Sequence, residues 1–72
     1  MRWFYNLQTQ RWKAMSNGWQ ATVIRVVDGD TWFGVIERRT PSHHEQYKSV
    51  NFEWAQQARS WCETEIAARN SG

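Results

Sequence analysis

The 72-residue chain has one cysteine, one proline and four glycines, and it contains no long apolar run. Its single thiol, Cys62, can neither close an internal disulfide nor supply the ligand set of a structural zinc site. No stretch approaches the ~18 apolar residues of a membrane-spanning helix, and the N-terminal residues lack the apolar segment of a secretory leader. We therefore expect a soluble, cytoplasmic protein with no membrane partner.

Large aromatic side chains are abundant instead. The chain has six tryptophans, three phenylalanines and two tyrosines, and each large ring can bury roughly 150–250 Å². Without disulfides or a metal, stability must come from packing these rings. No repeat or linker divides the sequence, so its length predicts one small domain over residues 1–72.

The C-terminal part has the pattern of a helix. Residues 51–69 contain neither glycine nor proline, and apolar side chains recur there at intervals of three and four. Ser49 or Asn51 can cap the start of this helix, because either side-chain oxygen accepts a bond from a free first-turn amide. The spacing predicts a buried helix face made of Trp54, Ala58, Trp61, Cys62 and Ile66.

A β-hairpin is predicted in the middle of the chain. Residues 21–27 and 31–36 are rich in β-branched and aromatic side chains and flank Asp28-Gly29, a pair that tolerates tight turns. A two-residue turn places Arg25 opposite Trp32. Both faces of the hairpin are largely apolar, yet one helix covers only one of them. The alternation leaves open which face is covered: the one that includes Ile24, Val26, Phe33 and Val35, or their opposite-face neighbours.

The flanking segments complete an α+β fold. Residues 11–15, followed by turn-forming residues 16–18, predict a strand before the hairpin. The fold is then a three-stranded antiparallel β-meander packed against one C-terminal α-helix. Trp3-Phe4-Tyr5 has two interpretations, a short extra edge strand or a lid over the uncovered face. Residues 38–48 are predicted to form a connecting loop.

The sequence offers no catalytic constellation. It has no glycine-rich phosphate loop and no Ser-His-Asp arrangement. His43 and His44 adjoin Glu45, but adjacent side chains point in different directions and no further ligand closes a metal site, which favours a solvated polar segment. Cys62 falls on the apolar stripe, which favours a buried structural thiol. We therefore expect that the protein is not an enzyme and that it binds no metal and no cofactor.

Two functions remain open. The uncovered apolar sheet face favours a non-catalytic interaction module that binds a protein partner or itself through a sheet face or an open edge. The alternative is nucleic-acid binding, since the net charge is +2 and the pI about 9.1, and cations hold phosphates while flat rings stack on unpaired bases. The candidate nucleic-acid contacts are Lys13, Arg25, Trp32, Arg38 and Arg39.

A resemblance of layout accompanies the second function. The predicted order of three strands and a helix is similar to that of the plant ethylene-response-factor DNA-binding domain and of phage integrase arm-binding domains. Residues 19–25 and 32–36 faintly resemble the second and third strands of the plant domain. The resemblance implies DNA binding with the sheet in the major groove. The dense arginines of the plant domain are missing here, so the resemblance covers the layout alone.

Overall fold

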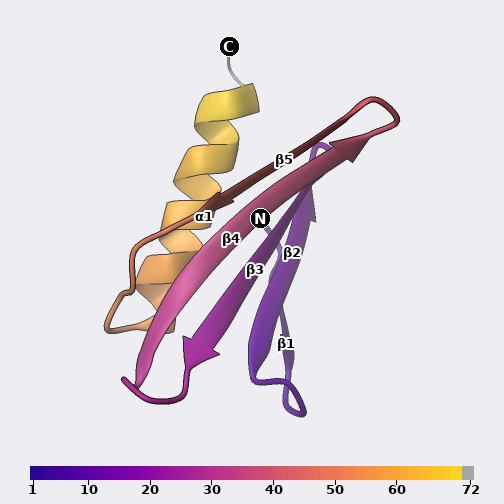
Figure 1. Cartoon of the computed structure of the whole chain (residues 1–72). Helices are drawn as coiled ribbons and strands as arrows, with labels where there is room; N and C mark the ends of the chain where they lie inside the picture. Colours follow the sequence, from indigo (N-terminus) through magenta and orange to yellow (C-terminus); the bar gives the residue numbers. More distant parts are fainter. Residues whose placement is uncertain (71–72) are drawn as a thin grey trace.

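The structure, a computed structural model, describes residues 1–70 as one antiparallel sheet and one helix (Figure 1). The sheet order follows the chain order from β1 to β5. This confirms the α+β class and the β-meander with a C-terminal helix, but the sheet has five strands rather than three. The elements are β1 (Phe4–Asn6), β2 (Arg11–Ser16), β3 (Trp19–Val26), β4 (Thr31–Thr40), β5 (His43–Lys48) and α1 (Ala55–Asn70).

The two additional strands lie at the sheet edges. Phe4 and Tyr5 belong to β1, which pairs with β2, so the edge-strand interpretation is the correct one for these two residues. The predicted loop over residues 38–48 is wrong, because β4 continues to Thr40 and β5 pairs back along it after a turn at Pro41-Ser42. Pairing with the long β4 satisfies the backbone groups of a segment that has few strand-forming side chains.

The central hairpin has the predicted register. Arg25 lies opposite Trp32 and Ile24 lies opposite Phe33. The turn occupies residues 27–30 rather than Asp28-Gly29 alone, and its positive φ angle, 53°, falls on Asp30. An aspartate tolerates this left-handed conformation better than most residues do. The strand pairing is the same as the one predicted with a two-residue turn.

The helix begins at Ala55, later than predicted. The Trp54 carbonyl accepts the backbone N–H of Gln57, and the Gln57 side-chain oxygen accepts the N–H of Trp54, at 3.1 and 3.0 Å. This reciprocal pair closes the first turn as a capping box does. Trp54 precedes the helix and is 62% exposed, so its predicted place in the buried helix face is wrong.

Ser49 and Asn51 do not cap the helix, because the chain is still attached to the sheet at this point. The Ser49 hydroxyl accepts the N–H of Gly34 at 2.8 Å and donates to the carbonyl of Val50. Phe52 then pairs with Trp32 through two backbone hydrogen bonds of 2.6 and 2.8 Å. The helix therefore starts only after this short extension of the sheet.

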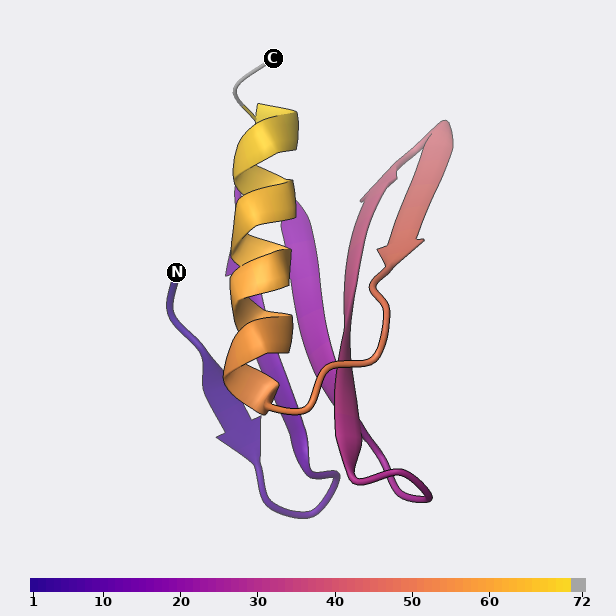
Figure 2. The ribbon, with the colours of Figure 1, turned by 90° about the vertical axis from the view of Figure 1, so that its left-hand side faces the viewer.

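The helix packs on β3 and β4, on the face opposite to Ile24 and Phe33 (Figure 2). Small residues permit close approach there: a Cβ on Gly34 would lie 2.7 Å from Cys62 Sγ. Of the predicted helix face, Trp61 is half-buried. The buried core residues are Ala14, Trp19, Ala21, Val23, Ile36, Ala58, Cys62 and Ile66.

The sheet curls around the helix, with β1 on one side of α1 and β4 and β5 on the other (Figure 2). Near β1, the Trp3 indole donates to Glu63 at 2.9 Å. At the other edge, the Arg69 guanidinium lies 4.1 Å from the Tyr47 ring centroid. One sheet face is thus wrapped on the helix, and the other, which we call the open face, is turned away from it.

Candidate functional site

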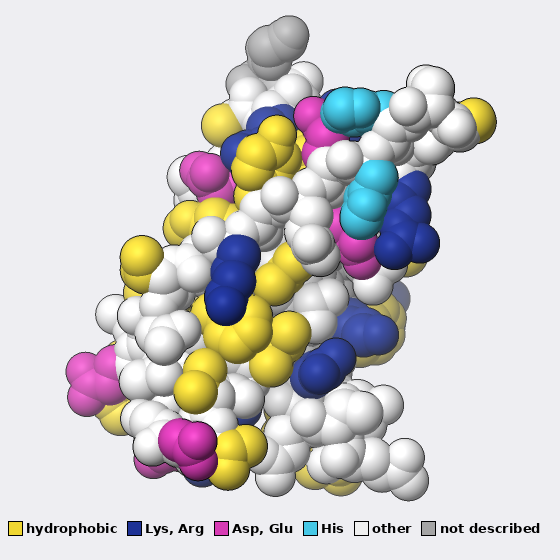
Figure 3. Space-filling view, viewed as in Figure 1, with side chains coloured by type: hydrophobic (Ala, Val, Ile, Leu, Met, Phe, Trp, Pro, Cys, Tyr) yellow, Lys and Arg dark blue, Asp and Glu magenta, His cyan; other side chains and the backbone are white. Residues whose placement is uncertain are grey.

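The open face is defined by strand register, because side chains alternate between the two faces of a sheet. It carries apolar side chains at its centre and at the β1 edge, and cationic side chains around them. The apolar side chains discussed below are Phe4, Ile24, Phe33 and Val35, and the cationic ones are Arg11, Lys13, Arg39 and Lys48. Figure 3 shows yellow apolar atoms flanked by dark blue cationic groups.

Both phenylalanines of the open face have a cation above the ring. The Lys48 ammonium lies 4.4 Å from the ring centroid of half-buried Phe33. The Arg2 guanidinium lies 5.3 Å from the ring centroid of Phe4, which is 62% exposed. The positive groups are attracted to the electron-rich ring faces, so each ring is adjacent to a group that can hold an anion.

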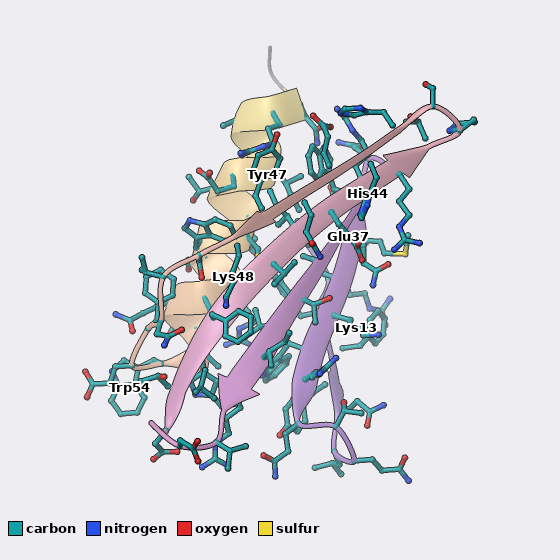
Figure 4. All side chains as sticks on the ribbon, in the orientation of Figure 1. Lys13, Glu37, His44, Tyr47, Lys48 and Trp54 are labelled. Carbon is teal, nitrogen blue, oxygen red and sulfur yellow. The ribbon has the colours of Figure 1, made fainter. Side chains whose placement is uncertain are left out.

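The cations lie on both sides of the apolar centre. Lys13 and Lys48 share one cross-strand row, through Thr22 and Val35. Three strand spacings separate the two lysines, which corresponds to about 14 Å between their backbones. Figure 4 shows their side chains on β2 and at the end of β5. A ligand that crosses the sheet between them meets a cation at either end of its path.

Glu37 is the one carboxylate that the register places on the open face among the described residues. Its carboxylate lies 3.2 Å from His44 Nε2 and 3.9 Å from the Arg39 guanidinium. Figure 4 shows Glu37 and His44 close together near the turn between β4 and β5. This end of the open face is therefore partly neutralised, whereas the cationic groups of Arg11, Lys13 and Lys48 lie farther from the carboxylate.

Several arginines on the helix side of the molecule are paired with carboxylates. Arg25 contacts Asp30, and Arg38 donates two hydrogen bonds to Glu45. The bond from Arg38 lowers the pKa of Glu45 below its usual value. Arg69 pairs with Glu65 at 3.1 Å. The positive charge of these three arginines is thus balanced locally, in contrast to that of Lys13 and Lys48 on the open face.

The five predicted nucleic-acid contacts do not form one site. Lys13 and Arg39 lie on the open face, whereas Arg25, Trp32 and Arg38 lie on the helix side, in register with the buried core residues. The sequence reasoning missed four open-face residues: Phe4, Arg11, Phe33 and Lys48. The alternation of Phe33, Val35 and Glu37 would have indicated Lys48, had residues 43–48 been read as a strand.

Two neighbouring hollows indent the β1 to β4 part of the open face. They have volumes of about 400 and 300 Å³ and share Met15 and Gln20. Together they form a furrow, which has Arg2, Phe4 and Lys13 at one end and Glu37 and Arg39 at the other. Its floor is partly apolar, and its two ends carry the guanidinium and ammonium groups described above.

The described residues offer little support for metal binding or for a reactive thiol. Within residues 1–70, no group of three or more His, Cys, Asp or Glu side chains is arranged to hold a metal ion. Cys62 is fully buried, and this burial raises the pKa of its thiol to about 12, with a smaller contribution from Glu63. A thiol that stays protonated and inaccessible is a poor nucleophile, which agrees with the predicted buried structural thiol.

In the part of the chain that the structure describes, no helix is both long enough and apolar enough to span a membrane. Comparison with protein-family models, curated proteins and solved structures finds no match.

Proposed function

We propose that the chain is a non-catalytic binding module and that its open face binds nucleic acid. One observation carries this proposal, the unequal distribution of charge between the two sides of the sheet. Arg11, Lys13, Arg39 and Lys48 share the open face with a single described carboxylate. The arginines on the helix side are largely paired.

A phosphate backbone is the ligand that such a face attracts. Each phosphate neutralised by a lysine or arginine releases condensed counterions, and this release favours binding at low salt. The side chains of Lys13 and Lys48 have no described hydrogen bond or ion pair within residues 1–70, so phosphate contact does not require breaking one. The half-buried apolar groups between them add contact area that is independent of charge.

A protein partner or self-association is the competing function. Exposed Phe4 and Met15 would suit either one. Two copies docked through their open faces would bring two surfaces with excess positive charge together, and this repulsion opposes binding. A protein partner would need an acidic surface, so charge alone does not distinguish it from nucleic acid.

The test uses fluorescently labelled oligonucleotides, single-stranded and duplex, and measures anisotropy over a salt series. With phosphate contacts contributing roughly 0.7 (single strand) to 0.9 (duplex) logarithmic units each at 0.1 M salt, Lys13→Gln/Lys48→Gln should weaken binding about 25- to 60-fold. The matched control is Gln56→Glu/Thr64→Glu, which changes the net charge equally but on exposed helix positions. This control should bind nearly as the parent does.

Two results would contradict the proposal. One is equal weakening by both double variants, since binding would then depend on net charge rather than on the open face. The other is the absence of salt-dependent binding to either oligonucleotide. Displacement of the oligonucleotide by poly-glutamate at equal charge concentration would favour an acidic protein partner instead.

A further inference from the structure

The open face combines cations with flat rings, and this combination distinguishes between the forms of nucleic acid. Phe4 and Phe33 present ring faces on the same side of the sheet as Lys13 and Lys48. In a duplex the bases stack on one another and offer only their edges in the grooves. In a single strand each base has a free face that can stack on an aromatic side chain.

The dimensions of the molecule limit which of its parts could enter a groove of a duplex. Its two shorter extents are 22 and 21 Å, whereas the major groove of B-form DNA is about 12 Å wide and admits a helix or a two-stranded ribbon. The end of the β4–β5 hairpin is such a ribbon, since Arg38, Arg39 and Thr40 have partners on β5 but none on β3. Its arginines, however, contact Glu45 and Glu37, which reduces their attraction for phosphate.

We propose that the open face binds single-stranded nucleic acid, with bases stacked on Phe4 and Phe33 and phosphates held by Arg2, Lys13 and Lys48. This inference rests on the proposed function. Binding moves the Lys48 ammonium from its place over the Phe33 ring to a phosphate and leaves the ring face to a base. Arg2 makes the same exchange at Phe4. Each ring and its cation thus form one unit that binds a nucleotide.

The furrow extends from the Phe4 unit along the sheet and does not include Phe33 or Lys48. It begins beside Phe4 and Lys13 and continues past Met15 and Gln20. The Gln20 side chain can donate to a base and accept from it, and the flexible Met15 side chain adapts to bases of different size. These properties predict tolerance of different sequences rather than recognition of one.

The experiment compares a labelled 15-nucleotide oligodeoxythymidine with a 15-base-pair duplex, using the whole chain at 0.1 M salt. We expect tighter binding to the single strand. Phe4→Leu/Phe33→Leu keeps both positions apolar and removes the rings, and it should weaken single-strand binding about fivefold or more, as expected when stacking is lost. Duplex binding by the same variant should change less than twofold.

Tyr5→Leu is the matched control, because Tyr5 neighbours Phe4 in the sequence but points to the other side of β1. It should leave single-strand affinity unchanged. Ring-proton NMR signals provide a second readout: base stacking should shift the Phe4 and Phe33 signals upfield, which electrostatic attraction alone does not do.

The outcomes separate the two proposals. If the duplex binds as tightly as the single strand, or if the phenylalanine variant binds the single strand like the parent, this inference is wrong. The proposed function would still stand if the lysine variant lost affinity. If neither oligonucleotide binds, both proposals fail together.

Discussion

Replacing Gly34 by alanine tests how closely the helix lies on the sheet. An added Cβ would lie 2.7 Å from Cys62 Sγ and 3.1 Å from both the Ala58 carbonyl oxygen and Trp61 Cε3. The first distance is too short for any side chain, and the Ala58 oxygen belongs to the helix backbone, so the whole helix must shift. Overpacking of this kind costs about 1–3 kcal/mol, of which the better strand conformation of alanine offsets about 0.5–1 kcal/mol.

We therefore expect Gly34→Ala to lower the free energy of unfolding by about 1 kcal/mol, and by no more than about 2.5 kcal/mol. In a domain of this size each kcal/mol corresponds to roughly 4–8 °C in Tm. Urea titration and thermal melting, followed by tryptophan fluorescence, measure the change. Gly29→Ala is the matched control, because its Cβ would meet only Thr31 Oγ1, at an ordinary 3.5 Å.

The reasoning is refuted if Gly34→Ala is as stable as the parent or more stable. A double-mutant cycle with Cys62→Ala identifies the atom responsible. Removing Sγ should relieve part of the clash, so the effects of the two substitutions should differ from additivity by at least about 0.5 kcal/mol. Strict additivity would show that Sγ is not what the new Cβ meets.

Three further predictions concern individual side chains. Trp54→Ala should change the free energy of unfolding by less than about 0.5 kcal/mol, because this ring is exposed rather than in the core; a larger loss in urea titration would contradict its placement. The Cys62 thiol should stay unreactive toward a thiol reagent at pH 8 until the chain unfolds, because burial raises its pKa to about 12; labelling as fast as in urea would contradict this. Arg38 lowers the pKa of Glu45 below 4.5, so their contribution to stability is present above pH 4.5 and is lost as the pH falls through the lower, folded-state pKa. Glu45→Gln should remove this part of the acid dependence in melting curves, and an unchanged pH profile would show that the pair does not contribute.

The elements that the sequence predicted correctly are those whose side chains are buried. Ala58, Cys62 and Ile66 are core residues of the helix, and the hairpin register followed from the Asp-Gly pair and the strands around it. In both cases a local pattern coincides with the packing that stabilises it. The sequence pattern therefore correctly indicated the type of element and the register of the hairpin strands at these positions.

The sequence pattern was misleading or undecided where strand pairing or side-chain shape decides the structure. β5 consists of exposed and half-buried polar side chains, and it is a strand because β4 offers a free edge, a fact that no local pattern contains. The choice of sheet face depends on shape, since Ala21 and Gly34 leave room for the helix. The alternation of side chains left this choice open, because it does not show that small residues allow the helix to approach.

The candidate surface was missed for the same reasons. Arg25 and Trp32 were correctly placed opposite each other, but the face they share is the one that the helix covers. Lys48 entered the open face only because β5 is a strand. Because residues 38–48 were predicted to form a loop, Lys48, one of the two lysines of the cross-strand row, was missed.

The order of the strands has a consequence for how quickly the chain folds. Each strand pairs only with the strand directly before or after it in the sequence, so the sheet can grow by successive hairpins that close short loops. Proteins rich in such local contacts fold faster than those that join distant segments. The bond from Trp3 to Glu63 joins residues 60 positions apart, and it can form only when the helix docks on the assembled sheet. We expect helix docking to be the late step, and substitutions at that contact to speed unfolding while leaving the folding rate nearly unchanged.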